Sequence, residues 1–454
     1  MVTDRTQAGD GGGAPEGDGG RGMRADRVTG SATERPGDGG QPPLVTVTVL
    51  LLSSLTVMAN ATISPALPGL ARAFPDTEGI ETLAGLALSL PSLSVVVTAI
   101  GFGVLLDRVD RRRLIAGLAL LYALAGASGV LAPGIWSLLA GRVVLGIAVA
   151  GLMSAVTMLA GELWRDGARD RFMGRQAAAT GVGGVVFILT GGALAALDWR
   201  GPFLVYLAAL PLAPLAYVVL AAPLRRRRDV EAARKPAGDD LPWSFVLSVC
   251  SVAFCVMVAF YLIPTRLPFR LEALGVTSPL VVGGTVAAVT AASVPVSLAY
   301  GRLHARFSFA AIFAGAIALI GLGLGTIAIA QGAVLSGVGC LCVGFGLGAV
   351  IPNQAAWLMS NVPGGARGRA SGLLTMAIFS GQFASPLVAA PLEGLGGTQA
   401  PFAVAGIAMA VLAGLMTYRQ LRGGLRAPDA ELRKHGDGAP PNDQGQLEDE
   451  RRRE

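Results

Sequence analysis

The chain has 454 residues and a formal net charge of +6, and 52% of its residues are hydrophobic while only 15% are charged. Soluble proteins carry about 25% charged residues, so this composition excludes an ordinary soluble domain and indicates an integral membrane protein. The four cysteines all lie inside apolar runs, and the chain has only two histidines. Because these residues lack metal-ligand spacing, a metal site is not expected.

Polar segments are expected at both ends of the chain. Residues 1–42 and 421–454 contain few large apolar residues and cannot bury enough surface to fold, so we expect disordered cytoplasmic tails. Between them lie twelve apolar runs of about 20 residues, the length of a membrane-spanning helix. The expected helices are 44–68, 82–106, 114–132, 136–161, 173–196, 202–222, 243–264, 279–302, 309–328, 333–358, 370–391 and 398–419.

The longest polar stretch between these helices is residues 223–242, which divides them into six and six. We therefore predict an all-α integral membrane protein with two six-helix bundles. The bundles are residues 43–222 and 243–420, and the cytoplasmic linker 223–242 joins them.

The distribution of arginine and lysine predicts the orientation. With the N-terminus inside, the inner loops carry 18 basic residues and the outer loops carry 4. The four outer residues are Arg72, Arg200, Arg266 and Arg270. This bias follows the positive-inside rule. We therefore expect a multi-pass protein of the cell membrane with both termini in the cytoplasm.

A cluster of charges separates the second and third expected helices. Residues 103–114 read G-V-L-L-D-R-V-D-R-R-R-L, with six charged side chains in the seven residues 107–113. Such a cluster cannot lie in hydrocarbon, so it indicates a tight turn at the membrane surface.

An internal repeat is visible at an offset of 198 residues. Residues 103–108 (G-x-L-x-x-R) recur at 301–306, and residues 169–174 (R-x-R-x-x-G) recur at 367–372. At the same offset, Gly141 and Gly146 correspond to Gly339 and Gly344. Two motifs at one offset in equivalent loops indicate the tandem duplication of a six-helix unit.

Over residues 44–420 the sequence resembles the major facilitator superfamily. Its signature for the loop between helices 2 and 3 is matched by Gly103, Leu105, Asp107, Arg108, Arg111, Arg112 and Leu114, whereas Asp110 replaces a usual glycine. Residues 138–146 and the Trp199-Arg200 pair before helix 6 are further matches to the superfamily. Residues 261–275 and 367–387 resemble twelve-helix bacterial drug:proton antiporters. The antiporter signature of helix 5 is incomplete, because Phe187 and Ile188 replace its Gly-Pro. The resemblance implies two halves that move around a central site.

The resemblance also implies a gate at the cytoplasmic end. Asp107 and Arg108 belong to it, and Asp107 is expected to face the start of helix 11, whose dipole favours an anion. Arg111 or Arg112 is expected to pair with Glu162 at the end of helix 4. The alternative is a loop that serves only to fix the topology.

Arg142 lies about six residues inside the fourth expected helix, where a charge is costly. Two interpretations are open for it. It takes part in coupling or substrate binding, as the family's helix 4 arginine suggests, or its side chain extends to the outer surface.

By resemblance, helices 1, 4, 7 and 10 line a central cavity. The candidate lining residues are Asn60, Met153, Phe254, Met257, Tyr261, Asn353, Gln354 and Trp357, together with Gln382 of helix 11. Few polar groups on an apolar wall suit a lipophilic ligand, although helix packing also explains the Met and Phe positions. Because no acid lies in a helix midsection, a neutral or anionic amphiphile is expected rather than a cation.

These observations predict a secondary transporter for multidrug efflux of small lipophilic or amphiphilic compounds, driven by proton antiport and without a bound cofactor. No phosphate-binding loop, metal motif or nucleophile–base pair is present, so an enzyme is not expected. The expected partners are a small-molecule substrate and the lipid bilayer, with no nucleic acid, and we expect a monomer. An importer or uniporter of a metabolite, and a non-transporting membrane sensor, are the open alternatives.

Overall fold

The computed structural model describes residues 41–164, 166–221 and 240–421, with only the backbone at a few positions that include Asp107 and Arg108. The predicted tails, except for Gln41, Pro42 and Leu421, and nearly all of the predicted linker lie outside these residues. Every regular element in the described part of the chain is a helix, and no strand occurs there. The predicted all-α fold is confirmed.

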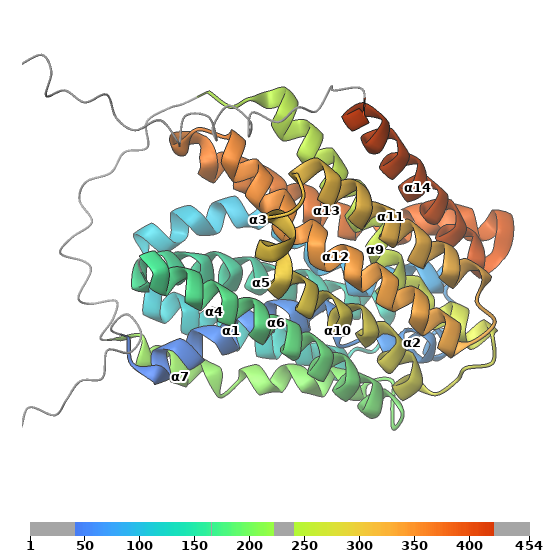
Figure 1. Ribbon diagram of the computed structural model, residues 1–454. Helices are drawn as coiled ribbons and strands as arrows, with labels where there is room; N and C mark the ends of the chain where they lie inside the picture. The colour runs from blue at the N-terminus through green and yellow to red at the C-terminus, as the bar shows by residue number, and fades with distance from the viewer. Residues whose placement is uncertain (1–40, 165, 222–239, 422–454) are drawn as a thin grey trace, which may run out of the picture. The chain divides into compact units, whose positions relative to one another are not determined.

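Within each half, the helices follow one another through short connections (Figure 1). The N-terminal half contains α1 (Pro43–Ala61), α2 (Leu67–Ala73), α3 (Ile80–Arg108), α4 (Arg111–Ala127), α5 (Ile135–Leu163), α6 (Asp166–Ala195) and α7 (Leu212–Val219), with 3₁₀ segments at Ser64–Ala66, Ser128–Val130 and Gly201–Ala209. The C-terminal half contains α9 (Trp243–Ala273), α10 (Pro279–His304), α11 (Phe309–Ile329), α12 (Ala333–Asn361), α13 (Arg367–Gly396) and α14 (Ala400–Leu421).

Eleven segments of the described chain are long and apolar enough to cross a membrane. The last of them, Gly364–Leu421, contains both α13 and α14, which the short 3₁₀ turn Gly397–Gln399 separates. This segment therefore provides two crossings, and the total is the twelve that the sequence predicts.

The charged cluster forms the tight turn that the sequence indicates. Helix α3 ends at Arg108 and α4 begins at Arg111, so only two residues separate them. The Asp110 carboxylate accepts a hydrogen bond from the backbone N–H of Arg112 at 3.1 Å and so caps the start of α4. Asp110 therefore caps α4 at the position where the family signature has a glycine.

The main departure from the predicted boundaries is at α9. This helix was expected to end at residue 264, but it continues to Ala273. Arg266 and Arg270 therefore lie inside the helix and are buried, so their assignment to an outer loop was wrong. Pro268 has no N–H to donate to the carbonyl of Pro264, four residues earlier. The hydroxyl of Ser64 donates to that carbonyl instead, at 2.6 Å, so the proline does not end the helix.

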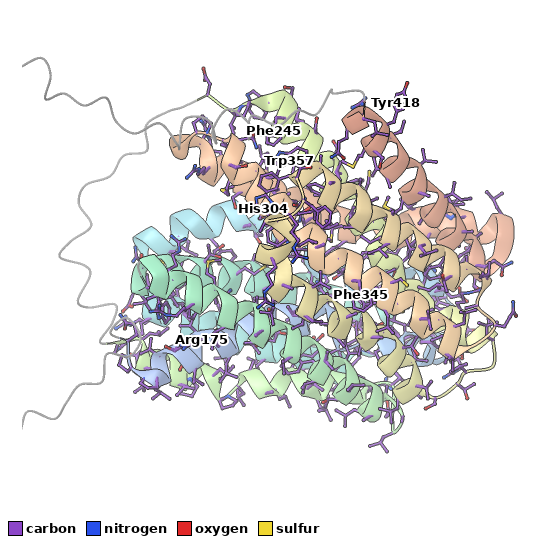
Figure 2. All side chains as sticks on the ribbon, viewed as in Figure 1. Arg175, Phe245, His304, Phe345, Trp357 and Tyr418 are labelled. Atoms are coloured by element: carbon purple, nitrogen blue, oxygen red, sulfur yellow. The ribbon has the colours of Figure 1, made fainter. Side chains whose placement is uncertain are left out.

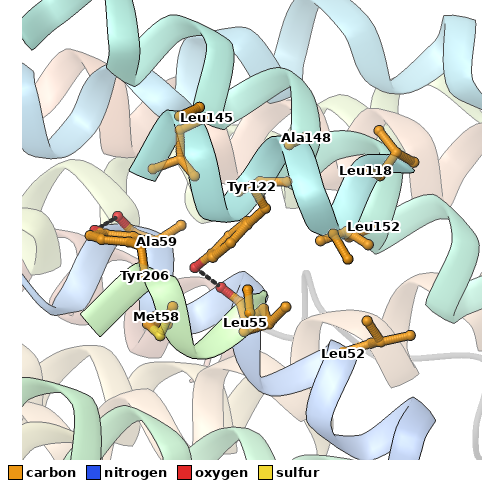
Figure 3. Packing of buried hydrophobic residues seen from close by; sticks show 14 of the residues in the cluster. Leu52, Leu55, Met58, Ala59, Leu118, Tyr122, Leu145, Ala148, Leu152 and Tyr206 are labelled. Atoms are coloured by element: carbon orange, nitrogen blue, oxygen red, sulfur yellow. Dashed lines mark hydrogen bonds between the residues drawn. The ribbon is translucent and has the colours of Figure 1, made fainter. Parts of the chain in front are cut away.

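The core of the N-terminal half is built around two buried tyrosines (Figure 3). Tyr122 of α4 donates a hydrogen bond to the carbonyl of Leu55 at 2.6 Å. Tyr206 donates to the carbonyl of Ala59 at 2.8 Å. Both acceptors lie on α1, so these bonds fix α1 against the rest of its half.

Glycine contacts show the duplication in three dimensions. A Cβ atom at Gly146 would lie 2.5 Å from the carbonyl oxygen of Pro91, and a Cβ atom at Gly344 would lie 2.3 Å from that of Val289. The second pair is the first pair displaced by 198 residues. Each half therefore packs its helices through the same close backbone approach, which only glycine allows.

The contacts between the halves are also duplicated. A Cβ atom at Gly85 of α3 would lie 3.0 Å from Pro386 of α13, and one at Gly283 of α10 would lie 3.3 Å from the carbonyl oxygen of Ile188 of α6. The offset of 198 converts Gly85 into Gly283 and Ile188 into Pro386. The α3–α13 and α6–α10 pairs are thus equivalent interfaces with the halves exchanged.

The substitution Gly344→Ala is expected to destabilise the protein. Its methyl group would collide with the Val289 carbonyl, a backbone atom that cannot turn away, and such overpacking costs about 1–3 kcal/mol. Thermal unfolding of the detergent-solubilised protein measures the effect. Gly337→Ala, in the same helix with open space around the added methyl group, is the matched control. Equal melting temperatures for the two variants would contradict the packing described here.

Candidate functional site

A cavity of about 700 Å³ lies between the two halves. Helices α1, α5 and α6 line it from the N-terminal half, and α9, α10, α12 and α13 line it from the C-terminal half. Its polar lining residues are Thr56, Asn60, Thr180, Tyr261, Thr290, Ser293, Ser297 and Gln382. The other lining residues are apolar or glycine, and none of the described lining residues is charged.

A small polar cluster joins both halves at the cavity wall. The amide of Asn60 donates to Ser92 Oγ at 3.4 Å, and Ser92 Oγ donates to Gln382 Oε1 at 2.8 Å. The bonds link α1 and α3 to α13. Asn60 Oδ1 is buried and has no hydrogen-bond partner among the described residues.

Four predicted lining residues line this cavity: Asn60, Met153, Tyr261 and Gln382. Five others, Phe254, Met257, Asn353, Gln354 and Trp357, are not among its described lining residues.

The structure gives packing roles to most of these five residues. Asn353 is buried, accepts a hydrogen bond from the Tyr300 hydroxyl at 3.0 Å and donates to the carbonyl of Phe309 at 3.0 Å. Trp357 lies in an aromatic cluster with Phe245, Phe309 and Phe313, and Figure 2 labels Trp357 and Phe245 there. Met257 and Gln354 are buried, whereas Phe254 is exposed. Asn353 thus has the hydrogen-bond partners that a mid-membrane amide needs, and these partners are protein groups rather than a ligand.

Five polar cavity residues were not predicted from the sequence: Thr56 lies on α1, Thr180 on α6 and the other three on α10. Thr290, Ser293 and Ser297 of α10 are spaced by three and four residues, which places them on one face of a helix whose other residues are mostly apolar. This polar stripe could have been recognised in the sequence. It was not predicted to line the cavity, because the resemblance implies a cavity lined by helices 1, 4, 7 and 10, and α10 is the eighth predicted helix.

The predicted gate residues lie at the arginine-rich end, which we define as the end that carries residues 109–110 and 305–308. Arg111 Nη1 lies 2.7 Å from Glu162 Oε1 and joins the start of α4 to the end of α5. The guanidinium of Arg112 lies 3.8 Å from the centre of the Tyr217 ring instead. The side chains of Asp107 and Arg108 lie outside the described residues, so their predicted role stays a prediction.

Arg142 is buried inside the N-terminal half, with 1% of its surface exposed. Its Nη1 donates to the Tyr206 hydroxyl at 3.0 Å, and its guanidinium lies 4.8 Å from the centre of the Phe203 ring. The interpretation that Arg142 extends to the outer surface is therefore wrong. It does not line the cavity either, but Tyr206 connects it to Ala59, the residue before Asn60.

The opposite end, which carries residues 74–79 and 274–278, is closed by bonds between the halves. Arg72 of α2 pairs with Glu272 of α9. The Ser64 hydroxyl donates to the carbonyl of Pro264, and Arg266 Nη2 donates to Thr82 Oγ1 at 3.3 Å.

The cavity extends in the other direction. Its lining includes Gly174 and Ala177 near the start of α6 and Leu298 near the end of α10. The other ends of these two helices pack tightly, since a Cβ atom at Gly192 would lie 2.8 Å from the carbonyl oxygen of Pro279. The structure therefore shows the site reaching toward the arginine-rich end.

A duplicated helical bundle with a cavity between its halves, closed at one end, is the architecture of a membrane carrier. The model of the Major Facilitator Superfamily matches residues 49–386, which is most of the chain. The chain belongs to this superfamily and is a multi-pass membrane transporter rather than an enzyme.

Among curated proteins, the chain is similar to two tetracycline resistance proteins. It is 31% identical to the class C protein of Escherichia coli over 162 residues, and 32% identical to the class G protein of Vibrio anguillarum over 163 residues. Each match covers 35% of this chain and 40% of the relative, so it spans about two fifths of the relative's length.

Solved structures share the fold. The human organic anion transporter MFSD10 aligns with a TM-score of 0.62 and 21% identity, covering 83% of this chain and 100% of that chain. A D-xylose-proton symporter aligns with a TM-score of 0.66 and 16% identity, covering 82% of this chain and 96% of that chain. These identities are low, so the likeness concerns the fold alone.

We predict that Tyr206→Phe destabilises the protein more than Tyr122→Phe does. Each variant removes one hydrogen bond to α1, but only Tyr206→Phe also takes a partner from the buried Arg142. Bonds to charged groups contribute about 1.5–3 kcal/mol, against about 1 kcal/mol for neutral ones. Thermal unfolding compares the two variants, and equal losses would show that Arg142 does not depend on Tyr206.

Proposed function

We propose that the protein exports small lipophilic or amphiphilic compounds across the cell membrane by alternating access, in exchange for protons and without a bound cofactor. The observation that carries the proposal is the cavity between the halves, which is mostly apolar and uncharged in its described lining. Its volume of about 700 Å³ suits a drug-sized ligand, since such sites measure about 300–1,000 Å³.

The lining favours a neutral ligand over a charged one. A cation in this cavity would meet no carboxylate among the described lining residues, and an anion would meet no arginine or lysine. A charge without a partner in an apolar site is costly. A ligand with one or two donors and acceptors could instead use Asn60, the α10 hydroxyl groups and Gln382.

The similarity to tetracycline resistance proteins supports export over import. The cavity extends toward the arginine-rich end, which the positive-inside rule places in the cytoplasm together with both termini. Importers and exporters both adopt such a state; in an exporter, the ligand enters it from the cytoplasm and later leaves at the opposite end.

For the gate at the arginine-rich end, the packing of α3 against α13 supports a role for Asp107. These helices run antiparallel, because Gly85 approaches Pro386 and Ser92 bonds to Gln382. The end of α3, with Asp107 and Arg108, therefore lies at the same end as the start of α13. Closure of this end would bring Asp107 to the N-terminus of α13, where an anion is favoured. Asp107 and Glu162 are the candidate proton carriers.

The first test measures accumulation of uncharged fluorescent amphiphiles in host cells that lack their own pumps. Cells that express the protein are expected to accumulate less of a substrate, and a protonophore is expected to abolish the difference. Higher accumulation would reverse the direction and indicate an importer. A difference in accumulation that persists in the presence of the protonophore would contradict proton coupling. No difference in accumulation for any compound of a broad panel would favour a sensor.

The second test concerns the gate. Asp107→Asn is expected to lower the export rate about tenfold or more, which corresponds to about 1.4 kcal/mol, while membrane insertion is unchanged. The matched control is Asp110→Asn in the same turn, since Asp110 caps α4. Export by Asp107→Asn at the rate of the control would remove Asp107 from the gate.

A further inference from the structure

The two arginines in the last turns of α9 have different kinds of partner. Arg270 Nε and Nη2 donate to the carbonyl groups of Ile327, Ala328 and Ala330, at 3.0, 2.6 and 2.9 Å. These carbonyls lie at the end of α11, where the helix supplies no donor. Arg270 therefore caps α11 and acts within the C-terminal half.

Arg266 contacts both halves of the protein. Its Nη1 lies 2.8 Å from Glu393 Oε2, and its Nη2 donates to the carbonyl of Pro386 at 3.0 Å. Both partners belong to α13, in the same half. The same Nη2 lies 3.3 Å from Thr82 Oγ1 on α3, in the other half.

Because Arg266 is buried, the loss of one of these contacts would be energetically costly. Its side chain has no exposed surface, and that of Glu393 is 15% exposed. A buried arginine needs a counter-charge, and the loss of that partner leaves a charge that is expensive to keep away from water. Glu393 supplies the partner that stays with Arg266 when the halves separate, whereas the contact with Thr82 would be lost.

We propose that Arg266 is a gating residue that holds the opposite end of the cavity closed. It attaches α9 and α13 to α3 through Thr82, and Glu393 keeps it in position. When the opposite end opens, Arg266 exchanges its α3 partner for water. This proposal rests on the alternating access that the proposed function includes.

A purely structural role would give a different outcome. If Arg266 only fastens α9 to α13, its loss would lower stability without changing which end of the protein is open. Two reporters separate these possibilities. Ala66 is 3% exposed and lies beside a cavity of about 250 Å³ at the opposite end, lined by both halves. Ala178 lines the central cavity near the arginine-rich end.

The experiment introduces Ala66→Cys or Ala178→Cys into the full-length protein after its four cysteines have been replaced by serine. Reaction of the purified protein in nanodiscs with a hydrophilic maleimide reports the exposure of each site. Without further substitutions, the Ala178→Cys reporter is expected to react faster than the Ala66→Cys reporter. The reverse order would overturn the proposal, because the opposite end would then not be closed.

Thr82→Val removes only the hydroxyl that faces Arg266 and should preserve the fold. It is expected to raise the labelling rate of the Ala66→Cys reporter about threefold and to lower that of the Ala178→Cys reporter, since a hydrogen bond contributes modestly. Glu393→Gln, which leaves Arg266 without its buried counter-charge, is expected to have a larger effect in the same direction. Thr82→Ser, which keeps the hydroxyl, is expected to leave both rates unchanged.

Ser385→Ala is the control for a structural role. The Ser385 hydroxyl donates to the Val258 carbonyl at 2.8 Å and joins α13 to α9 without reaching the other half. This variant is expected to lower the melting temperature while both labelling rates stay as they were. If Thr82→Val also leaves both rates unchanged, Arg266 is not a gating residue, even if Glu393→Gln fails to fold.

The test is independent of the substrate and of proton coupling. If cells that express the protein show no change in amphiphile accumulation, the proposed export fails. A shift of the labelling rates in the Thr82→Val variant would still support Arg266 as the gating residue.

Discussion

A backbone carbonyl in the membrane interior has no water to bond to, and this constraint decides where α9 and α12 meet their neighbours. Each proline in a helix deprives the carbonyl four residues earlier of its donor. Pro352 does this to Gly348, and the hydroxyl of Ser297 on α10 donates to Gly348 at 2.9 Å. Ser64 does the same for the Pro264 carbonyl from the other half. The missing helical bonds thus become bonds between helices, one of which helps to close the opposite end.

The duplication makes the two interfaces between the halves depend on each other. The α3–α13 and α6–α10 contacts are related by exchange of the halves, from Gly85 and Pro386 to Gly283 and Ile188. Glycine brings the helices so close at these points that any separation breaks many contacts at once. Both interfaces must therefore loosen together for the opposite end to open. The polar bonds differ between them, because Arg266 serves the α3–α13 interface, whereas its equivalent in the N-terminal half at the offset of 198 is Pro68.

The sequence was sufficient for the features that the bilayer dictates and insufficient for those that depend on the direction of a side chain. Span length and charge placement predicted twelve helices, and the repeat at 198 residues predicted the tandem duplication of a six-helix unit. The extension of α9 could not be predicted, because Pro264, Pro268 and two arginines are typical of a loop. The groups that keep them in a helix, such as Ser64, Ile327 and Glu393, lie far away in sequence.

The same limit applied to the cavity. Asn60 and Asn353 are both amides in apolar helices, and only the rotation of each helix decides which one faces the ligand. Asn60 lines the cavity, whereas Asn353 bonds to Tyr300 and Phe309.

The uncharged lining of the cavity also has an electrical consequence. Moving a charge through the membrane potential takes about 2.3 kcal/mol per 100 mV, but neither this lining nor a neutral ligand carries a charge. Reorientation of the lining and of a neutral ligand should then need no electrical work, and any voltage dependence of the flux must come from charges elsewhere, such as a coupled ion or the buried side chains of Arg142 and Arg266.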